Sequence, residues 1–395
     1  MLKKIRRVLG SARLRGATAT LVCAAGIIFF LSYHLGSSPS GLSPQEAAAR
    51  ASAALHAIAN MPINAPFKIV QNGLIHIDPQ SHFLLRFASV IFTSIFLGCF
   101  FYLLKGWFGK SIALLTTIIL AFTPYFILAA RSAGGEIMFF APVAVLASYL
   151  VATKNISERP PFFLFFFCTI LSLYVPGMLW LLLLGAILRF SRIKEILVEV
   201  EFSVVQYFLL LLVALIIWAP LFYGIYQHPG QVKLLLLIPA HFTTMTASLQ
   251  SWLWMLSATF FHAHTHYNLI VDKLPLLNAA EVGLLVFGCY IMWSRLKLEL
   301  FGILVLTLLI TALAGLNNNY AMLGLALPFL AIVVGMGLRY LYIEWRYVFP
   351  LNPIAKGFAI TLMSALVLMH VIFGIRYSLM AWPNTVATTH TYVVK

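Results

Sequence analysis

The sequence predicts an all-α polytopic membrane protein, and its composition and hydropathy pattern carry that prediction. Of its 395 residues, 62% are hydrophobic and only 9% are charged, whereas soluble domains carry about a quarter charged residues. Long apolar runs alternate with short loops that contain lysine and arginine, as in chains that cross a bilayer several times. The formal net charge of +15 needs no nucleic acid to explain it, because cytoplasmic loops of membrane proteins collect positive charge. It would also suit an anionic lipid substrate.

The cysteines do not indicate a metal site or a disulfide framework. All four lie inside apolar runs that are far apart in the sequence: Cys23, Cys99, Cys168 and Cys289. The chain contains no CxxC pair and no Cys/His spacing of the kind that binds zinc.

The N-terminal region predicts one membrane span with a cytoplasmic start. Residues 1–16 carry six basic side chains and no acidic one, and the apolar run 17–35 follows. A secretory signal peptide shares the basic start, but this run is long enough to span and no clear A-x-A cleavage site follows it. We therefore expect an uncleaved first span after a basic cytoplasmic N-terminus.

The first long outer loop, residues 36–82, contains a helix start. Ser43 suits an N-cap, Pro44 the first helical position, and Glu46 the third, which together form a capping-box pattern. Residues 47–59 are rich in alanine and helical in character, and residues 67–77 form a second amphipathic piece. Two short helices on the outer membrane surface fit this pattern.

Charge places the remaining spans, because every basic loop falls on one side. The expected apolar segments are 83–104, 111–130, 137–152, 161–174, 177–188, 202–226, 279–293, 300–316, 320–338 and 357–375. Segments 161–174 and 177–188 are short and are read as a half-depth or tilted pair. The result is about eleven crossings within a transmembrane domain 17–376, with a cytoplasmic N-terminus and a short external tail 377–395. Residues 228–278, rich in aromatics and histidine, form a second outer loop along the interface.

The stretch 123–140 predicts a hairpin of two membrane-length helices with Arg131 and Glu136 at its tip. An ionisable group at the mouth of a membrane helix is a functional candidate, because burying it near lipid is expensive. The alternative is that Glu136 sits at a helix start, where the macrodipole favours it, and pairs with Arg131. Arg131 in turn could clamp a phosphate with its planar fork, or be an ordinary interface arginine.

Few carboxylates lie on the expected outer side. They are Glu46, Asp78, Glu136, Asp272 and Glu281. Glu46 and Glu136 both stand at helix starts on that side, so they form a candidate general base and its partner, which would deprotonate an acceptor hydroxyl or amine. A capping role alone is the alternative for Glu46.

Three histidines alternate in the second outer loop: His262, His264 and His266. In an extended segment they would share one side and could bind a metal. No carboxylate is spaced to complete such a site, and a polar surface loop is the commoner explanation. With Lys273 nearby, the histidines could instead contact a lipid phosphate.

Several short motifs resemble those of GT-C glycosyltransferases of the protein mannosyltransferase and lipid A aminoarabinose transferase type. They are the first-loop acid, Arg86-Phe-Ala-Ser at the start of the second span, the inner turn Lys105-Gly-Trp-Phe-Gly-Lys110, and the segment Leu120–Glu136 with its Thr-Pro, Arg and acid. The resemblance covers roughly residues 17–230 well and the remainder in outline.

The resemblance implies an inverting glycosyltransferase that takes a sugar from a polyprenyl-phosphate donor on the outer face of a bacterial plasma membrane. A lipid, glycan or protein would be the acceptor, and a divalent metal would be optional rather than required. Glu46 and Glu136 would be catalytic. The donor phosphate would be bound by Arg131, Lys68, Lys273 and His262. In place of the family's His-Pro-Pro motif this chain has Ala65-Pro66-Phe67-Lys68.

Two other functions stay open at this point. A transporter or flippase of a lipid-linked glycan precursor would have the same solvent and lipid contacts, and a membrane scaffold of the same fold would lack the chemistry. Transporters usually show internal repeats or charges near mid-membrane. This chain shows no convincing repeat, and its polar residues concentrate in two outer loops, which favours the transferase.

Overall fold

The computed structural model describes residues 12–239, 244–264 and 269–393, and within these ranges the chain is helical and contains no β-strand. The early helices are α2 (Ala12–Ser32), α3 (Pro44–Ser52), α4 (Leu55–Asn60), α5 (Ala65–Ile75), α6 (His82–Phe108), α7 (Lys110–Phe122), α8 (Pro124–Arg131) and α9 (Ala141–Lys154). The later helices are α10 (Arg159–Ser172), α11 (Met178–Leu188), α12 (Phe190–Glu199), α13 (Val204–Gln227), α14 (Gly230–Leu235), α15 (Met245–Phe260), α16 (Ala279–Arg295), α17 (Lys297–Leu316), α18 (Leu327–Val348), α19 (Pro353–Arg376) and α20 (Val386–Thr391).

The described helices confirm a multi-pass membrane protein. Six are long and apolar enough to cross a bilayer, and the bent pair α7 and α8 makes a seventh if it counts as one span. Three shorter apolar helices, over 18–32, 159–172 and 178–188, are further candidates. The expected number of about eleven crossings is compatible with this set, but the structure does not fix it.

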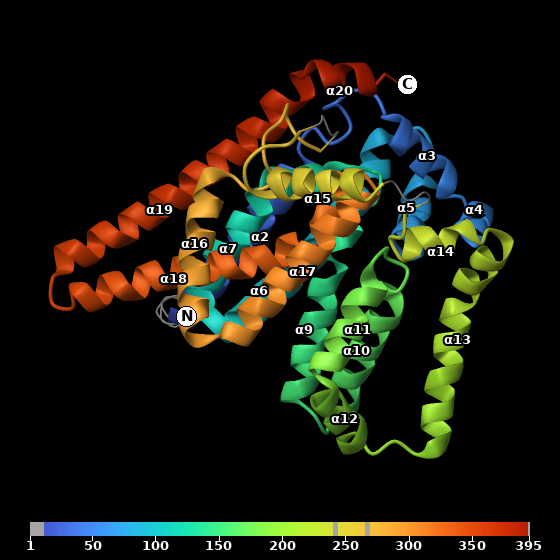
Figure 1. Ribbon diagram of the computed structural model, residues 1–395, viewed down its shortest axis with the longest axis horizontal. Coiled ribbons are helices and arrows are strands. Elements are labelled where there is room, and N and C mark those ends of the chain that lie inside the picture. Colours follow the sequence, from blue (N-terminus) through green and yellow to red (C-terminus); the bar gives the residue numbers. More distant parts are fainter. Residues whose placement is uncertain (1–11, 240–243, 265–268, 394–395) are drawn as a thin grey trace, which may run out of the picture.

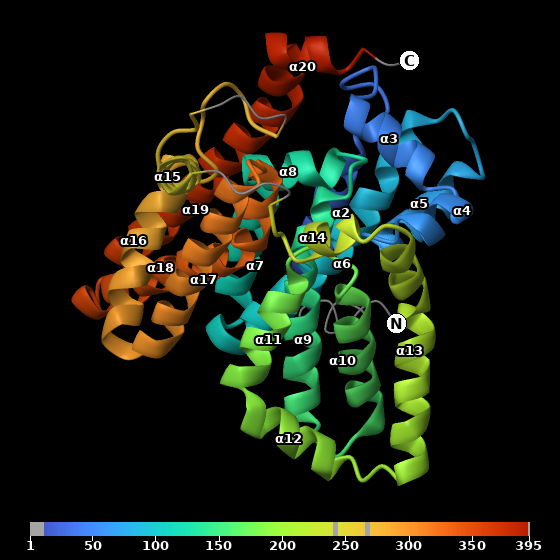
Figure 2. The same ribbon diagram turned by 45° about the vertical axis from the view of Figure 1, so that its right-hand side comes forward.

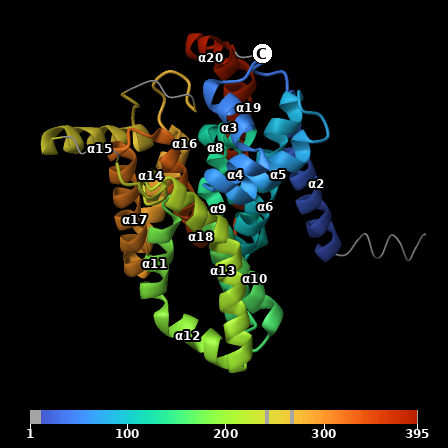
Figure 3. The same ribbon diagram turned by 90° about the vertical axis from the view of Figure 1, so that its right-hand side faces the viewer.

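The short helices of the first outer loop gather at one end of the molecule. Figures 1, 2 and 3 show α3, α15 and α20 in the upper part of every view and α12 at the opposite end, and Figures 2 and 3 show α8 in the upper part as well. The chain therefore brings the first loop, the 131–136 turn and the C-terminal segment to one end. The basic segment after α11, expected on the cytoplasmic side, forms the helix α12.

The predicted start of the first-loop helix is confirmed. The Ser43 hydroxyl accepts a hydrogen bond from the Glu46 amide at 3.1 Å, and Glu46 Oε2 accepts one from the Ser43 amide at 3.3 Å. The helix expected over 47–59 is interrupted, because Ala54 has an extended backbone and α4 starts after it. Nothing in the local sequence explains this interruption.

The expected span over 111–130 is not one straight helix, since it bends by 67° between α7 and α8. Pro124 lacks an N–H and its ring collides with the preceding turn, so a helix cannot run straight through it. The carbonyl oxygen of Ile119, freed by the break, accepts hydrogen bonds from Thr123 Oγ1 at 3.0 Å and from His370 Nε2 at 2.9 Å. The His370 side chain of α19 thus provides a hydrogen-bond donor for a carbonyl that the break leaves without its helical partner.

A buried polar network fixes the same bend. Thr123 Oγ1 and Glu281 Oε1 are hydrogen-bonded, and Glu281 Oε2 accepts from the Asn278 amide at 2.9 Å. The Asn278 side-chain amide lies 2.7 Å from His370 Nδ1. Since His370 Nε2 faces a carbonyl, it carries the proton, and Nδ1 accepts from Asn278. Glu281, expected on the outer side, is therefore only 2% exposed and joins α16 to the bend.

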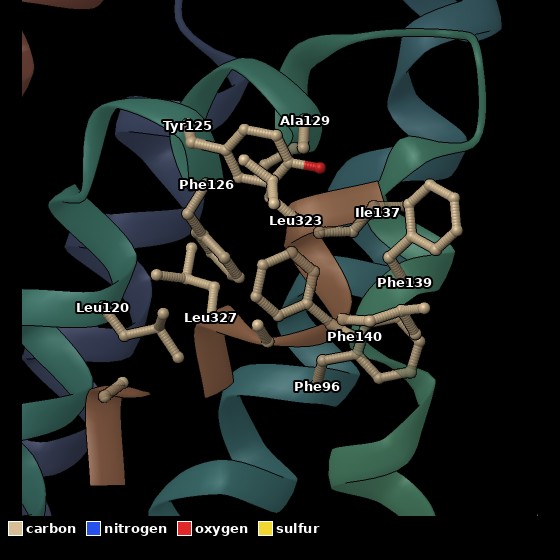
Figure 4. Packing of buried hydrophobic residues seen from close by; sticks show 14 of the residues in the cluster. Phe96, Leu120, Tyr125, Phe126, Ala129, Ile137, Phe139, Phe140, Leu323 and Leu327 are labelled. Carbon is tan, nitrogen blue, oxygen red and sulfur yellow. The ribbon is translucent and has the colours of Figure 1, made fainter. Parts of the chain in front are cut away.

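The hairpin residues of α8 pack in an aromatic core. Figure 4 shows Tyr125 and Phe126 of α8 facing Phe140, with Leu323 and Leu327 beside them. The ring of Phe126 meets that of Phe140 edge-on, with centroids 4.7 Å apart. Because the bend points α8 into this core, all of its residues are buried. The turn that follows α8 is thus attached to a helix whose side chains are packed in the core.

Candidate active site

The turn between α8 and the next helical segment presents Glu136. Arg131 ends α8, Gly135 adopts a left-handed backbone with φ of +84°, and a 3₁₀ segment Glu136–Phe140 follows. The sequence predicted an α-helix opening at Glu136, but regular α-helix begins only at Ala141. The positive φ explains why glycine stands at position 135, since a side chain is strained there.

The backbone of this turn is held by three other segments of the chain. The Ala133 amide donates to Glu46 Oε1 at 3.1 Å, and the Ala133 carbonyl accepts from Gln71 Nε2 at the same distance. The hydroxyl of Ser89 donates to the carbonyl of Ser132. α3, α5 and α6 therefore all bind a turn of a few residues, which fixes the position of the carboxylate that follows it.

Glu46 is buried in an ion pair. Its side chain lies 2% exposed beside Arg86, and the two form a fork-like contact with Nε to Oε1 at 3.0 Å and Nη2 to Oε2 at 2.9 Å. With the amides of Ala133 and Ser43 added, the Glu46 carboxylate accepts four hydrogen bonds. These contacts favour a positioning role for Glu46. The catalytic role expected from the sequence stays a prediction.

Arg86 organises the first outer loop. Besides Glu46, its Nη1 donates to the carbonyls of Leu35 at 2.9 Å and Pro39 at 3.0 Å, and its Nη2 donates to that of Gly41 at 2.7 Å. All five guanidinium N–H groups thus have acceptors. The arginine ties the end of the first span, the start of α6 and the Glu46 helix into one unit.

Glu136 is less enclosed than Glu46. Its carboxylate is half-buried, and Oε2 accepts a hydrogen bond from the Ser132 hydroxyl at 2.8 Å. It lies directly against Gly134, where an added Cβ would overlap the carboxylate oxygens. Glycine at 134 therefore leaves room for the Glu136 side chain. Of the two expected catalytic carboxylates, Glu136 has the fewer restraining contacts in the described structure.

A cavity of about 260 Å³ lies on the turn, between the first-loop helices and residues 133–134. Its lining comes from α3, the connection between α4 and α5, α5 and the turn: Gln45, Ala48, Ala49, Ser52, Met61, Asn64, Phe67, Lys68, Gln71, Ala133 and Gly134. Pockets for drug-sized ligands measure about 300–1,000 Å³. This cavity is therefore smaller than a typical drug-sized pocket.

The polar lining of this cavity combines one cation, Lys68, with three side-chain amides and the hydroxyl of Ser52. Lys68 Nζ donates to the Met61 carbonyl at 2.7 Å, and burial lowers the pKa of Lys68 to about 8. Gln71 Oε1 and Asn64 Oδ1 are buried and have no hydrogen-bond partner among the described residues. Lys68 is the cationic side chain of this lining, so the cavity is suited to a negatively charged group.

Arg131 does not pair with Glu136 in the described structure. Its Nη1 donates to the carbonyls of Phe30, Leu31 and Tyr33 at 3.3, 3.0 and 2.8 Å, so it caps the end of α2. Its Nη2 is buried and has no partner among the described residues. The expected role in binding a donor phosphate stays a prediction.

His262 and Lys273 lie together in the connection from α15 to α16, apart from the hairpin contacts. The Ala263 amide donates to the Lys273 carbonyl at 2.9 Å, and this hydrogen bond joins the two sides of the connection. Within residues 12–239, 244–264 and 269–393, no three His, Cys, Asp or Glu side chains group closely enough to hold a metal. His266 lies outside the described residues, so the three-histidine hypothesis stays untested.

Sequence reasoning named Arg86 only as part of a motif, and it missed Gln71. The signal for Arg86 was present: an arginine in the first turn of an apolar span is expensive unless it is paired. Ser89 of the same motif was likewise a contact of the turn, as its hydrogen bond to Ser132 shows. Gln71 gave no signal, because glutamine in an amphipathic helix is usually solvent-exposed.

No protein-family profile and no curated protein sequence matches the chain. Several solved structures match by fold, and two of them are of the same protein. Apo ArnT from Cupriavidus metallidurans has a TM-score of 0.56 at 16% identity, over 97% of this chain and 76% of that one. The structure of the same protein bound to undecaprenyl phosphate has a TM-score of 0.56 at 14% identity, over 95% and 75%. The chain therefore shares the fold of ArnT, the GT-C fold that its motifs predicted.

Proposed function

We propose that this protein is a membrane glycosyltransferase that moves a sugar from a polyprenyl-phosphate donor to an acceptor on the outer face of the membrane. The observation that carries the proposal is the turn 131–136. Ala133 and Gly134 of this turn line a small cavity that contains a lysine, the Glu136 carboxylate lies against Gly134, and three segments of the chain hold the turn. The similarity in fold to ArnT, one structure of which contains undecaprenyl phosphate, supports the donor class.

The proposed reaction is a direct displacement at the anomeric carbon. An acceptor oxygen or nitrogen forms a bond to that carbon while the bond from the carbon to the phosphate oxygen breaks, and the electron pair leaves with the polyprenyl phosphate. The acceptor's proton passes to a carboxylate. Such a base typically contributes about 10²–10⁴ in rate. The outcome is inversion at the anomeric carbon.

We assign the base to Glu136 and a positioning role to Glu46. Among the described residues Glu136 accepts from one side-chain donor, the Ser132 hydroxyl, so it retains acceptor capacity for a substrate proton. Glu46 already accepts four hydrogen bonds and neutralises Arg86. If Glu46 were the base, as the sequence alone suggested, Arg86 would lose its buried anion at each turnover.

The donor phosphate fits best beside Lys68. The lysine lines the cavity, and its amine has only one hydrogen-bond acceptor in the described structure, the Met61 carbonyl. A phosphate there would gain a charge-assisted hydrogen bond, which is about twice as strong as a neutral one. Arg131, Lys273 and His262 are further proposed contacts; none of them lines this cavity.

We further propose that the chain lies in a bacterial plasma membrane with its N-terminus in the cytoplasm and its site outside. The basic loops support this orientation because lysine and arginine accumulate on the cytoplasmic side. Reporter tags at Ser38 would then read outside and tags at Lys154 inside. A cytoplasmic signal from Ser38 would remove the outer-facing site.

The decisive test compares lipid extracts of cells with and without the protein. Loss of a transferase leaves its polyprenyl-phosphate sugar unused, so that lipid accumulates, and wild-type protein restores its consumption. Glu136→Gln should fail to restore it at normal protein levels, whereas Glu158→Gln, an exposed carboxylate outside the site, should restore it fully. Unchanged lipid profiles without the protein, or full restoration by Glu136→Gln, would reject the proposal.

A further inference from the structure

The C-terminal segment returns to the first outer loop. After α19 the chain continues through Tyr377–Ala381 and Trp382–Asn384 into α20, which Figures 1 and 3 show at the same end of the molecule as α3. Trp382 is buried, and the Tyr377 hydroxyl accepts a hydrogen bond from the Val271 amide. The segment expected as a short external tail is thus folded and attached to the second outer loop.

Tyr392, just after α20, contacts the buried ion pair. The guanidinium carbon of Arg86 lies over its ring, 5.8 Å from the centroid. The edge of the ring meets Trp382, with centroids 5.4 Å apart. Burial, and next the negative charge of Glu46, raise the pKa of Tyr392, while a hydrogen bond with the Ser43 side chain opposes that rise. The phenol is therefore neutral at physiological pH and touches both Arg86 and the cap of α3.

These contacts complete the enclosure of the ion pair. The five N–H groups of Arg86 all find acceptors around its edge, and the Tyr392 ring covers a face. The Ser43 amide donates to Glu46 Oε2 from another side of the pair. An aromatic ring on a desolvated guanidinium excludes water, and ionic hydrogen bonds strengthen when water is excluded.

We propose that the segment Trp382–Tyr392 is a strap that holds the Glu46–Arg86 pair, and through it the 131–136 turn, with Tyr392 as a positioning residue. Glu46 is the link, because its Oε1 accepts from both Arg86 and the Ala133 amide. The effect of the strap on catalysis rests on the proposed function. Its effect on the turn does not.

The test is hydrogen exchange of peptides that cover residues 131–136, measured on purified full-length protein in detergent. Tyr392→Leu removes the ring and should speed exchange of the Ala133 amide by about ten- to thirtyfold, the range that a desolvated cation–π contact supplies. Tyr392→Phe keeps the ring and should restore most of the protection. Val393→Ala, at an exposed neighbour, is the matched control and should change nothing.

Two further readings make the outcome unambiguous. Exchange in α10, which the strap does not contact in the described structure, should stay unchanged, so that general unfolding is distinguished from loosening of the turn. Unchanged exchange of the turn in Tyr392→Leu, or equal effects of Val393→Ala, would overturn the strap. If the turn loosens but wild-type protein transfers no sugar, the strap stands and the proposed function fails.

Discussion

Replacing Glu46 by glutamine separates a structural role from a catalytic one. The wild-type carboxylate accepts from four N–H groups, two of Arg86 and one each of Ser43 and Ala133. Glutamine keeps one oxygen and turns an NH₂ group toward two of these donors. The buried arginine also loses its anion. Breaking one side of a buried ion pair costs roughly 3–5 kcal/mol.

That cost should appear as a lower thermal transition of the purified protein in detergent. At about 2–4 °C per kcal/mol, the loss of roughly 3–5 kcal/mol predicts a fall of roughly 6–20 °C. Glu136→Gln is the matched control, because the partner of Glu136 is the Ser132 hydroxyl and not a buried cation. Its free energy of unfolding should therefore change by no more than about 1 kcal/mol. Transfer activity should fall in both variants, but only Glu46→Gln should lose it together with stability.

One result would refute this reasoning. If Glu46→Gln keeps the wild-type transition and donor binding while losing turnover, the ion pair is not what makes Glu46 important. The sequence-based assignment of Glu46 as the base would then be preferred. Conversely, wild-type turnover in Glu136→Gln would place the base elsewhere, whatever the stability of either variant.

Three further outcomes follow from the site. Gly134→Ala should displace the adjacent carboxylate and reduce transfer at least tenfold with little change in thermal transition, whereas Gly73→Ala, which has nothing within 4 Å, should leave transfer intact. Since burial lowers the pKa of Lys68 to about 8, its charge is present at pH 7 and lost by pH 9. Affinity for undecaprenyl phosphate should therefore fall across that range in titrations, and Lys68→Arg should remove the dependence. Thr123→Val deletes a buried partner of the bend and should cost roughly 1–3 kcal/mol in thermal unfolding, against a smaller effect of Thr169→Val, whose hydroxyl bonds only its own helix.

The sequence by itself determined the class of protein and several local features. Composition alone requires a bilayer, because so few charged residues cannot cover a soluble domain of this length. The capping box at Ser43 is confirmed because it depends on residues three apart. The short pair over 161–188 is confirmed as α10 and α11, with left-handed Gly177 between them.

Only the tertiary structure decided what each ionisable group contacts. Glu46 and Arg86 are 40 positions apart, and Tyr392 is some 300 beyond them. Helix periodicity and charge patterns constrain neighbours within a turn or two, and they do not specify which distant segments pack together. The sequence marked Glu46, Arg131 and Glu136 as costly ionisable groups, but partners from distant segments decide that Glu46 is enclosed, that Arg131 caps α2, and that Glu136 keeps the more open carboxylate.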